Sequence, residues 1–353
     1  MKKQAIQFLC VVLFFGILLS MTLYLGIGML SPTDKGEEKT GYDVNYALSE
    51  HQGIQKFVRY IDYKIFRHIE DRSVVVGKKN WLFETVDPYS GFDYLLDYVN
   101  GCPYTEEEMK RIGDRLAEKE AAYAARGVEY RMVVIPSTYT ACGEFLPNYL
   151  GEPSESTRLS VLSNYLKERE ISTFIDLSEE MAETDAQNAR YHNTEDSINA
   201  YGGFTVYDTL MTSLAQNHAS LSDYRLAFED IEFTVRRTDG KQIARRVSLE
   251  SVVPNHTVSL TNQLDDVYFM TDTTEHCVSS HMEEGFEGSD LSVLVECSRE
   301  WDKIQLIPYF SSTFRQVTYE NQMTDGKISV VRHSPDVYIQ IIHEGELDLL
   351  LAE

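Results

Sequence analysis

The chain has 353 residues and is strongly acidic, with 56 aspartates and glutamates against 32 lysines and arginines and a formal net charge of −24. Such a body is repelled by nucleic acid phosphates and by anionic lipid headgroups. The composition therefore excludes nucleic acid as a partner, and the excess acid favours solubility.

An apolar run close to the start of the sequence predicts a membrane anchor. Lys2 and Lys3 precede residues 5–30, which are uncharged and mostly apolar. As a helix this run would be about 39 Å long, at about 1.5 Å per residue, and would span the lipid bilayer. The positive-inside rule places the two lysines in the cytoplasm and the bulk of the chain outside the cell membrane. A cleaved signal peptide is the alternative, although the run is long for one.

The remaining chain predicts one extracytoplasmic domain behind a short connection. Residues 31–72 read as a juxtamembrane linker that passes into a helix around Tyr46–Arg67. The folded domain is expected to cover residues 73–353, because strand and helix patterns begin at Ser73 and no second long apolar run follows.

Helices and strands alternate through most of this domain, which predicts an α/β fold with a mainly parallel sheet and flanking helices. Thr105 and Glu108 form a capping-box pattern that begins a helix ending at Gly127. The other expected helices are 154–169, 199–216 and 303–314. The expected strands are 73–76, 81–83, 130–136, 172–177, 292–295 and 336–343.

The pattern changes between residues about 227 and 270, where a β-rich insertion is expected. Ile231–Arg237, Ile243–Leu249 and Val258–Leu260 alternate between apolar and polar residues, as antiparallel strands do.

Five cysteines are present, and Cys10 lies in the predicted anchor. The other four allow three disulfide pairings in an oxidising compartment. Pairing by proximity in the sequence would join Cys102 to Cys142 and Cys277 to Cys297. The spacings contain no C-x-x-C and no H-x-x-x-H, so neither a metal nor a cofactor is predicted.

The most informative motif is Thr194–Phe204, which reads T-E-D-S-I-N-A-Y-G-G-F. It resembles the T-D-x-H-W-N-x-x-G-A signature of SGNH-hydrolase-like proteins of the alginate O-acetyltransferase type and of the related DHHW bacterial family. The family's Asp falls on Glu195 and its catalytic His falls on Ser197. Asn199 and Tyr201 are the predicted substrate-binding positions.

Three further blocks resemble the same family in order. Residues 74–83 are similar to its opening V-x-G-K-x-G-W-L-F, and the strand ending at Pro136 is similar to its strand-P-N-K segment. Residues 293–298, followed by 306–310, resemble the strand-G-D-S-F nucleophile block and its L-x-P-Y-L helix. The resemblance covers most of residues 73–353, and it implies an SGNH-hydrolase-like, flavodoxin-like fold.

The family chemistry needs a Ser nucleophile, a His base and an Asp that orients the His. By the resemblance, the nucleophile falls on Ser298, preceded by Cys297 where the family has Asp. A serine at position 197 has no basic pKa near neutrality and does not replace an imidazole. The catalytic motif is therefore degenerate.

Catalytic activity would require another histidine to act as the base. His192 is nearest to Glu195 in the sequence, and it is the candidate base beside four histidines in the C-terminal third, His276, His281, His333 and His343. Cys297 as a thiol nucleophile is a further alternative, although a buried structural cysteine fits an apolar strand end better.

Members of this family add or remove acetyl groups on cell-surface polysaccharides, often beside a membrane-bound O-acyltransferase. The resemblance implies a membrane-anchored protein of polysaccharide O-acetylation with a degenerate site, a pseudoenzyme whose partners are the polysaccharide, that acyltransferase and the lipid bilayer. The alternatives are an active O-acetyltransferase or acetylesterase that uses Ser298 with a displaced His, and a non-catalytic cell-envelope scaffold.

Overall fold

The computed structural model describes residues 16, 58–67, 69–182, 185, 189–261, 264, 266–274, 277–321 and 327–352. Residues 53–353 form one compact unit, and residues 1–52 are a separate one. The predicted anchor over residues 5–30 lies outside the described residues apart from Gly16. Among the residues that are described, no helix has both the length and the apolar character required to cross a membrane.

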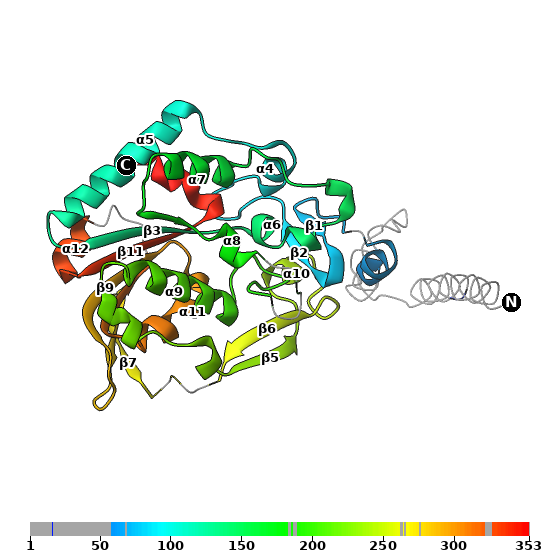
Figure 1. Ribbon diagram of the computed structural model, residues 1–353. Coiled ribbons are helices and arrows are strands. Elements are labelled where there is room, and N and C mark those ends of the chain that lie inside the picture. The colour runs from blue at the N-terminus through cyan, green and yellow to red at the C-terminus, as the bar shows by residue number, and fades with distance from the viewer. Residues whose placement is uncertain are drawn as a thin grey trace, which may run out of the picture. The chain divides into compact units, whose positions relative to one another are not determined.

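A seven-stranded sheet forms the centre of the compact unit (Figure 1). Its order is β4-β3-β11-β9-β10-β8-β7. The first five strands are mutually parallel, β8 is antiparallel to β10, and β7 is antiparallel to β8. Their bounds are β3 Glu129–Ile135, β4 Phe174–Asp176, β7 Tyr268–Thr274, β8 Cys277–Met282, β9 Ser289–Cys297, β10 Phe314–Glu320 and β11 Val337–His343. The predicted mainly parallel α/β sheet is confirmed.

Strand β11 lies in the middle of the five parallel strands, and all seven of its residues are buried. Its side chains alternate between the two faces. Ile339 and Ile341 belong to one hydrophobic cluster, while Tyr338 and Ile342 belong to another. Parallel strands covered on both faces read as nearly continuous apolar runs, which is why this segment was recognised from its sequence.

Helices cover both faces (Figure 1). On one face, α5 (Glu106–Ala124) and α7 (Arg158–Glu168) pack on the cluster that contains Tyr338. On the other, α9 (Ala200–Leu214) and α11 (Glu300–Ser311) pack on the cluster that contains Ile339. The predicted capping box is present, since Thr105 accepts a hydrogen bond from the Glu108 amide and the Glu108 carboxylate accepts one from the Thr105 amide.

The glycines of the Thr194–Phe204 motif permit close packing of α9. A Cβ on Gly202 would collide with the carbonyl of Arg190, and one on Gly203 would collide with the carbonyl of Gln305 in α11. The two helices therefore approach at backbone distance, which fixes the start of α9 over the end of the sheet.

Two small sheets flank this core. The predicted strand–turn–strand is present as β1 (Val74–Val76) paired with β2 (Leu82–Glu84). The second small sheet pairs β5 (Phe233–Thr238) with β6 (Asn255–Leu260). The remaining helices and turns are α4 Tyr94–Asn100, α6 Thr138–Ala141, α8 Ser178–Met181, α10 Gln242–Arg246, α12 Lys327–His333, a π turn at Asp62–Phe66, and 3₁₀ turns at Lys78–Asn80, Gly143–Phe145, Asn148–Leu150, Ala219–Asp223, Phe228–Asp230 and Glu344–Leu350.

One predicted strand is wrong. Residues 243–249 begin inside helix α10, and Ile243, Ala244 and Val247 pack in a small cluster with Leu82. Their spacing places them on one side of a helical turn, a period that competes with alternation in so short a segment.

The proximity pairing of cysteines is also wrong, because Cys102, Cys142, Cys277 and Cys297 are all thiols in the structure. Cys277 is opposite Glu320, and Glu320 is opposite Glu296. Cys277 is thus two strand spacings, about 10 Å, from the strand that carries Cys297. A disulfide requires Cα atoms within about 7 Å.

Candidate functional site

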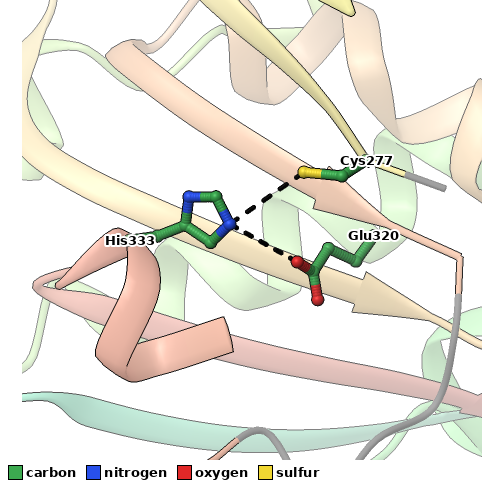
Figure 2. Close-up of side chains that lie close together, drawn as sticks. All are labelled: Cys277, Glu320 and His333. Atoms are coloured by element: carbon green, nitrogen blue, oxygen red, sulfur yellow. Dashed lines mark hydrogen bonds and ion pairs between the residues drawn. The ribbon is translucent and has the colours of Figure 1, made fainter. Parts of the chain in front are cut away.

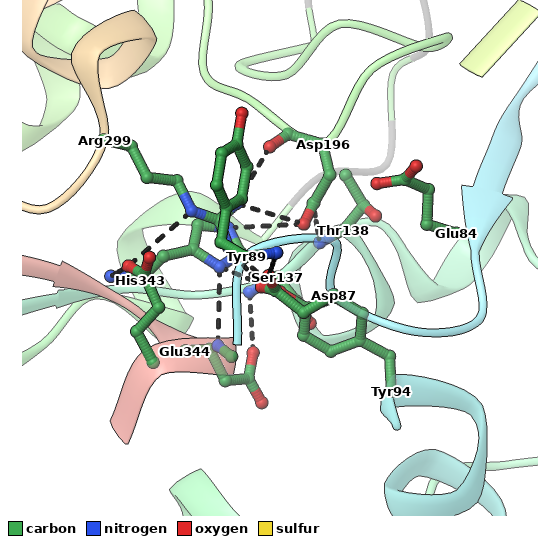
Figure 3. Close-up of polar contacts among 12 residues, drawn as sticks. Glu84, Asp87, Tyr89, Tyr94, Ser137, Thr138, Asp196, Arg299, His343 and Glu344 are labelled. Carbon is green, nitrogen blue, oxygen red and sulfur yellow. Dashed lines mark hydrogen bonds and ion pairs between the residues drawn. The ribbon is translucent and has the colours of Figure 1, made fainter. Parts of the chain in front are cut away.

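Polar side chains gather where three parallel strands end, at the edge of the sheet where open α/β folds bind ligands. Ser137 follows β3, Arg299 follows β9, and Glu344 follows β11. Asp87 joins them from the loop after β2, and Asp196 joins from the loop before α9. Figure 3 shows these side chains pointing toward one another.

Arg299 is at the centre of this site, with only 4% of its side chain exposed. Its guanidinium pairs with Asp87 and with Asp196, whose Oδ2 is 3.5 Å from Nη1. Burial alone would lower the pKa of Arg299, but Tyr94 and the surrounding carboxylates outweigh burial and raise it well above its usual range. We call Asp87, Asp196, Arg299 and His343 the Arg299 cluster.

Two tyrosines enclose the guanidinium. The ring of Tyr89 lies over it, 5.0 Å from ring centroid to Cζ, and its other face is open to solvent. The hydroxyl of Tyr94 donates to Asp87 and lies 3.1 Å from Nδ1 of His343. Burial raises the pKa of Asp87, but the charge of Arg299 and the Tyr94 hydrogen bond lower it by more, so this carboxylate is ionised.

His343 is the histidine that the structure brings into the site. It is fully buried, and burial together with the charge of Arg299 holds its pKa well below the usual range, so the ring is neutral. Its Nδ1 faces the Gly345 amide and the Tyr94 hydroxyl, while its Nε2 lies 3.6 Å from Oδ2 of Asp196. Neither Nε2 nor that Oδ2 has a hydrogen-bond partner among the described atoms.

Ser298, the predicted nucleophile, is at this edge but is directed elsewhere. Its hydroxyl donates to the carboxylate of Glu346, and its amide bonds to the carbonyl of Ile341. Glu346 also lies 3.7 Å from Nε of Arg299. The group beside Ser298 is therefore a carboxylate that already neighbours Arg299. A carboxylate is a weaker general base than an imidazole.

The predicted partners Glu195, Ser197 and His192 belong to a different set of contacts. Glu195 pairs with Lys241 at 3.0 Å. His192 is buried, contacts Lys241 Nζ at 3.0 Å and Asn255 at 3.2 Å, and its pKa is lowered to about 3 by burial and by the lysine charge. Ser197 is buried, and its carbonyl accepts the amide of His192. These contacts stabilise the loop and do not assemble a triad around Ser298.

The two predicted substrate-binding positions differ in their surroundings. Asn199 is buried and caps α9, accepting the amides of Tyr201 and Gly202. Tyr201 packs on Phe228 and Phe233 and lines a separate hollow of about 750 Å³.

The thiol of Cys297, the alternative nucleophile, is fully buried. Burial raises its pKa, which makes it a poor nucleophile.

A cavity of about 660 Å³ opens beside the Arg299 cluster. Tyr94, Ser137 and Glu344 belong to both the cavity wall and the polar site. The rest of the lining combines polar residues, including Lys78, Tyr139, Thr140, Glu144, Asn148 and Glu152, with apolar residues such as Leu146 and Pro147. The hydroxyl of Tyr139 is buried and has no hydrogen-bond partner among the described atoms, so it is available to a bound polar molecule.

Glu344 is a buried carboxyl group of this cavity wall. Its carboxylate accepts the Ser137 amide at 2.6 Å and the Thr140 hydroxyl at 2.9 Å. Burial nevertheless raises its pKa to about 7. The next residue, Gly345, has no room for a side chain, because a Cβ would collide with Asp87 and Tyr94.

Asp87, Asp196 and His343 have the donor atoms of a metal site, all within 4.8 Å of one another. The guanidinium of Arg299 pairs with both carboxylates, however, and supplies the positive charge that a metal ion would supply. The arrangement does not fit a metal.

No sequence motif placed Arg299, Asp87 or Glu344 in the site. His343 was expected only as one of several alternative bases. A usable signal did exist. Charged residues directly follow two buried strands, as Ser-Arg-Glu after β9 and as His-Glu-Gly-Glu at the end of β11. In a parallel sheet such positions meet at one edge.

No family model and no curated protein matches this sequence. Solved structures do match it. PatB1 of Bacillus cereus, solved with a sulfonyl adduct, is 13% identical over 79% of this chain and 96% of its own, with a TM-score of 0.50. A DHHW family protein from Eubacterium siraeum is 11% identical over 79% of this chain and 95% of its own, also at 0.50. The O-acetyltransferase domain of Pseudomonas putida AlgJ is 14% identical over 78% and 92%, at 0.46.

These likenesses concern the fold. The chain shares the α/β fold of PatB1 and of the DHHW family protein, and the fold expected from the four sequence blocks is confirmed.

Proposed function

We propose that this chain is a membrane-anchored, extracytoplasmic SGNH-like protein that takes part in the O-acetylation of a cell-surface polysaccharide by binding the glycan, without itself transferring acetyl groups. The observation that carries the proposal is the Arg299 cluster. A buried arginine and its carboxylates fill the edge of the sheet where a serine hydrolase needs an accessible nucleophile and base.

We expect no acyl transfer because of the surroundings of Ser298 and the identity of residue 197. Acyl transfer requires a hydroxyl whose proton passes to a neighbouring base. Ser298 donates to Glu346, and Ser197 stands where the family has its histidine. A carboxylate is a far weaker general base than an imidazole, so little nucleophilic serine is formed.

Glycan binding is supported by the cavity of about 660 Å³ and by its lining of hydroxyl, amide and carboxylate groups. Sugars present many hydroxyls that both donate and accept hydrogen bonds, and such walls match them. The likeness of fold to PatB1 and the DHHW protein, with the four motif blocks, supports a place among SGNH-like proteins.

Anchoring is supported by Lys2, Lys3 and the apolar residues 5–30. An anchor would hold the cavity close to the membrane, where a membrane-bound O-acyltransferase delivers acetyl groups. Such an acyltransferase is the proposed protein partner.

The first test is hydrolysis of a small aryl acetate by the purified protein and by its Ser298→Ala variant. We expect no turnover above the background reaction in either.

The second test measures binding of acetylated and non-acetylated polysaccharide fragments by calorimetry. Asn148→Trp should fill the cavity and abolish binding, while Gln216→Trp, at an exposed position in the turn after α9, should not. Absence of glycan binding would favour the scaffold alternative and overturn the proposal.

A second candidate is an active transferase or esterase, and one observation favours it. His343 is neutral and lies 3.6 Å from Asp196, so a histidine and an aspartate are already neighbours in the site. Turnover that disappears in both Ser298→Ala and His343→Gln would establish this candidate. Turnover that survives both variants would indicate a contaminating esterase.

A further inference from the structure

A second group of chemically active side chains lies outside the Arg299 cluster, on the neighbouring strands β8 and β10. Cys277 is the first residue of β8, Glu320 is the last residue of β10, and the two are directly opposite in the antiparallel pair. His333 is the last residue of α12. Figure 2 shows the imidazole pointing between the thiol and the carboxylate. We call these three residues the Cys277 cluster.

The distances in the Cys277 cluster are close to those of a zinc site. Nε2 of His333 is 3.4 Å from Oε1 of Glu320 and 4.0 Å from Sγ of Cys277. All three ligand atoms lie within 4.8 Å of one another. Tetrahedral Zn²⁺ with bonds of about 2.3 Å to sulfur and about 2.1 Å to nitrogen and oxygen separates its ligand atoms by about 3.4–3.6 Å. The two distances that involve Nε2 are therefore within a few tenths of an ångström of those values.

The surroundings hold the ligands in place and leave one side accessible. Cys277 is 3% exposed, whereas the side chain of His333 is 14% exposed. Ser329, on α12, donates its hydroxyl to Oε2 of Glu320 at 2.5 Å. That hydrogen bond orients the carboxylate so that Oε1 faces the histidine, as partners of metal ligands do in zinc proteins.

We propose that Cys277, Glu320 and His333 bind a Zn²⁺ ion, with a water molecule as the fourth ligand. Thiolate, imidazole and carboxylate are the three kinds of side chain that bind zinc. The thiol proton of Cys277 is released to solvent when the Zn–S bond forms, and the two negative ligands then balance the charge of the ion. The ion would fasten α12 to the strands β8 and β10.

The sequence does not reveal this site because its residues come from three separate elements. The antiparallel register of β8 and β10 brings Cys277 opposite Glu320, and α12 then places His333 over the pair. The spacing therefore matches no short zinc motif. The proposal does not depend on the glycan-binding function, since none of the three residues lines the cavity beside the Arg299 cluster.

The test uses the full-length protein with Zn²⁺ and with Co²⁺ as the probes. After dialysis against zinc, we expect about one equivalent per chain by elemental analysis. Co²⁺ should give the intense charge-transfer absorption of a cobalt–thiolate bond, which requires a cysteine ligand. Cys277→Ser and His333→Gln should each lose both signals. The matched controls Cys102→Ser and His281→Gln should keep them, because these residues lie outside the cluster.

Ser329→Ala gives a graded readout, because it removes the hydrogen bond to Glu320 and leaves all three ligands. Zinc affinity should fall by about 10–100-fold, the usual effect of losing an orienting partner. Circular dichroism of each variant verifies that it is folded. Wild-type protein that binds no zinc would overturn the proposal. So would zinc bound equally by the wild type and by both Cys277→Ser and His333→Gln, since that result indicates adventitious binding.

Discussion

The Arg299 cluster and the Cys277 cluster offer similar donor atoms and have opposite electrostatic arrangements. Each contains three potential metal ligands within 4.8 Å of one another. In the first, a guanidinium of the same chain pairs with both carboxylates, and the negative charge is balanced internally. In the second, the carboxylate is paired with a histidine that is itself a potential ligand. Ligand geometry alone therefore does not define a metal site, because the position of the nearest cation decides whether an ion is needed.

The largest expected effect is in the Arg299 cluster. Arg299→Leu leaves Asp87 and Asp196 buried without their partner, which should lower the free energy of unfolding by about 3–5 kcal/mol relative to wild type measured at the same zinc concentration. Urea unfolding of both proteins measures this loss.

Arg315→Leu is the matched control for that variant. Its ion pair with Asp290 is on the surface, with side chains 56% and 92% exposed, and a surface pair contributes at most about 1 kcal/mol. Equal losses in the two variants would mean that the Arg299 pairs are hydrated and not buried.

The next effect concerns Glu344, which lies in the cavity wall beside the Arg299 cluster. The pKa of Glu344 is raised to about 7, above its unfolded value near 4.5, so the folded state holds the proton more tightly. The stability that this group contributes is present below about pH 4.5 and is lost as the pH rises through 7. The stability of Glu344→Gln relative to wild type should therefore increase by about 3 kcal/mol between these pH values.

Denaturant titrations of both proteins at several pH values measure that difference. An offset that stays constant with pH would show that Arg299 or water stabilises the ionised Glu344, and that the internal charge balance extends into the cavity wall.

The smallest effect belongs to the Cys277 cluster. Zinc at about 100 times its dissociation constant should raise the free energy of unfolding by about 2.7 kcal/mol, because only the folded chain brings the three ligands together. Melting curves with zinc and with a chelator measure it, using Cys277→Ser as the unresponsive control. Stabilisation of Arg299→Leu by the same increment would show that the two clusters are energetically independent.

Much of the fold was predictable because its signals are local. The capping box at Thr105, the buried run of β11 and the glycines that start α9 each specify their own structure within a few residues. Strands β7, β8 and β10 and helix α12 were not predicted, and the expected helix 303–314 included Phe314, the first residue of β10. In the α10 region, alternation and helical periodicity compete over too few residues to be separated.

The site was predicted less well, because it is made by register and loops. Ser298 was placed at the correct edge of the sheet, but its hydrogen bond to Glu346 depends on how the chain turns after β11. His192 was chosen for nearness in sequence, whereas His343 enters the site through the parallel pairing of β11 with β3 and β9. Nearness in the sequence does not report which strands are neighbours.

The central position of β11 has a consequence for biosynthesis. Strands β3 and β9 pair with β11 and not with each other, so the sheet stays split until the segment Val337–His343 has been synthesised. Until then, both halves expose unpaired strand edges that are prone to aggregation. The chain must therefore complete its sheet late, after the segments that carry β3, β9 and β10 have already been synthesised.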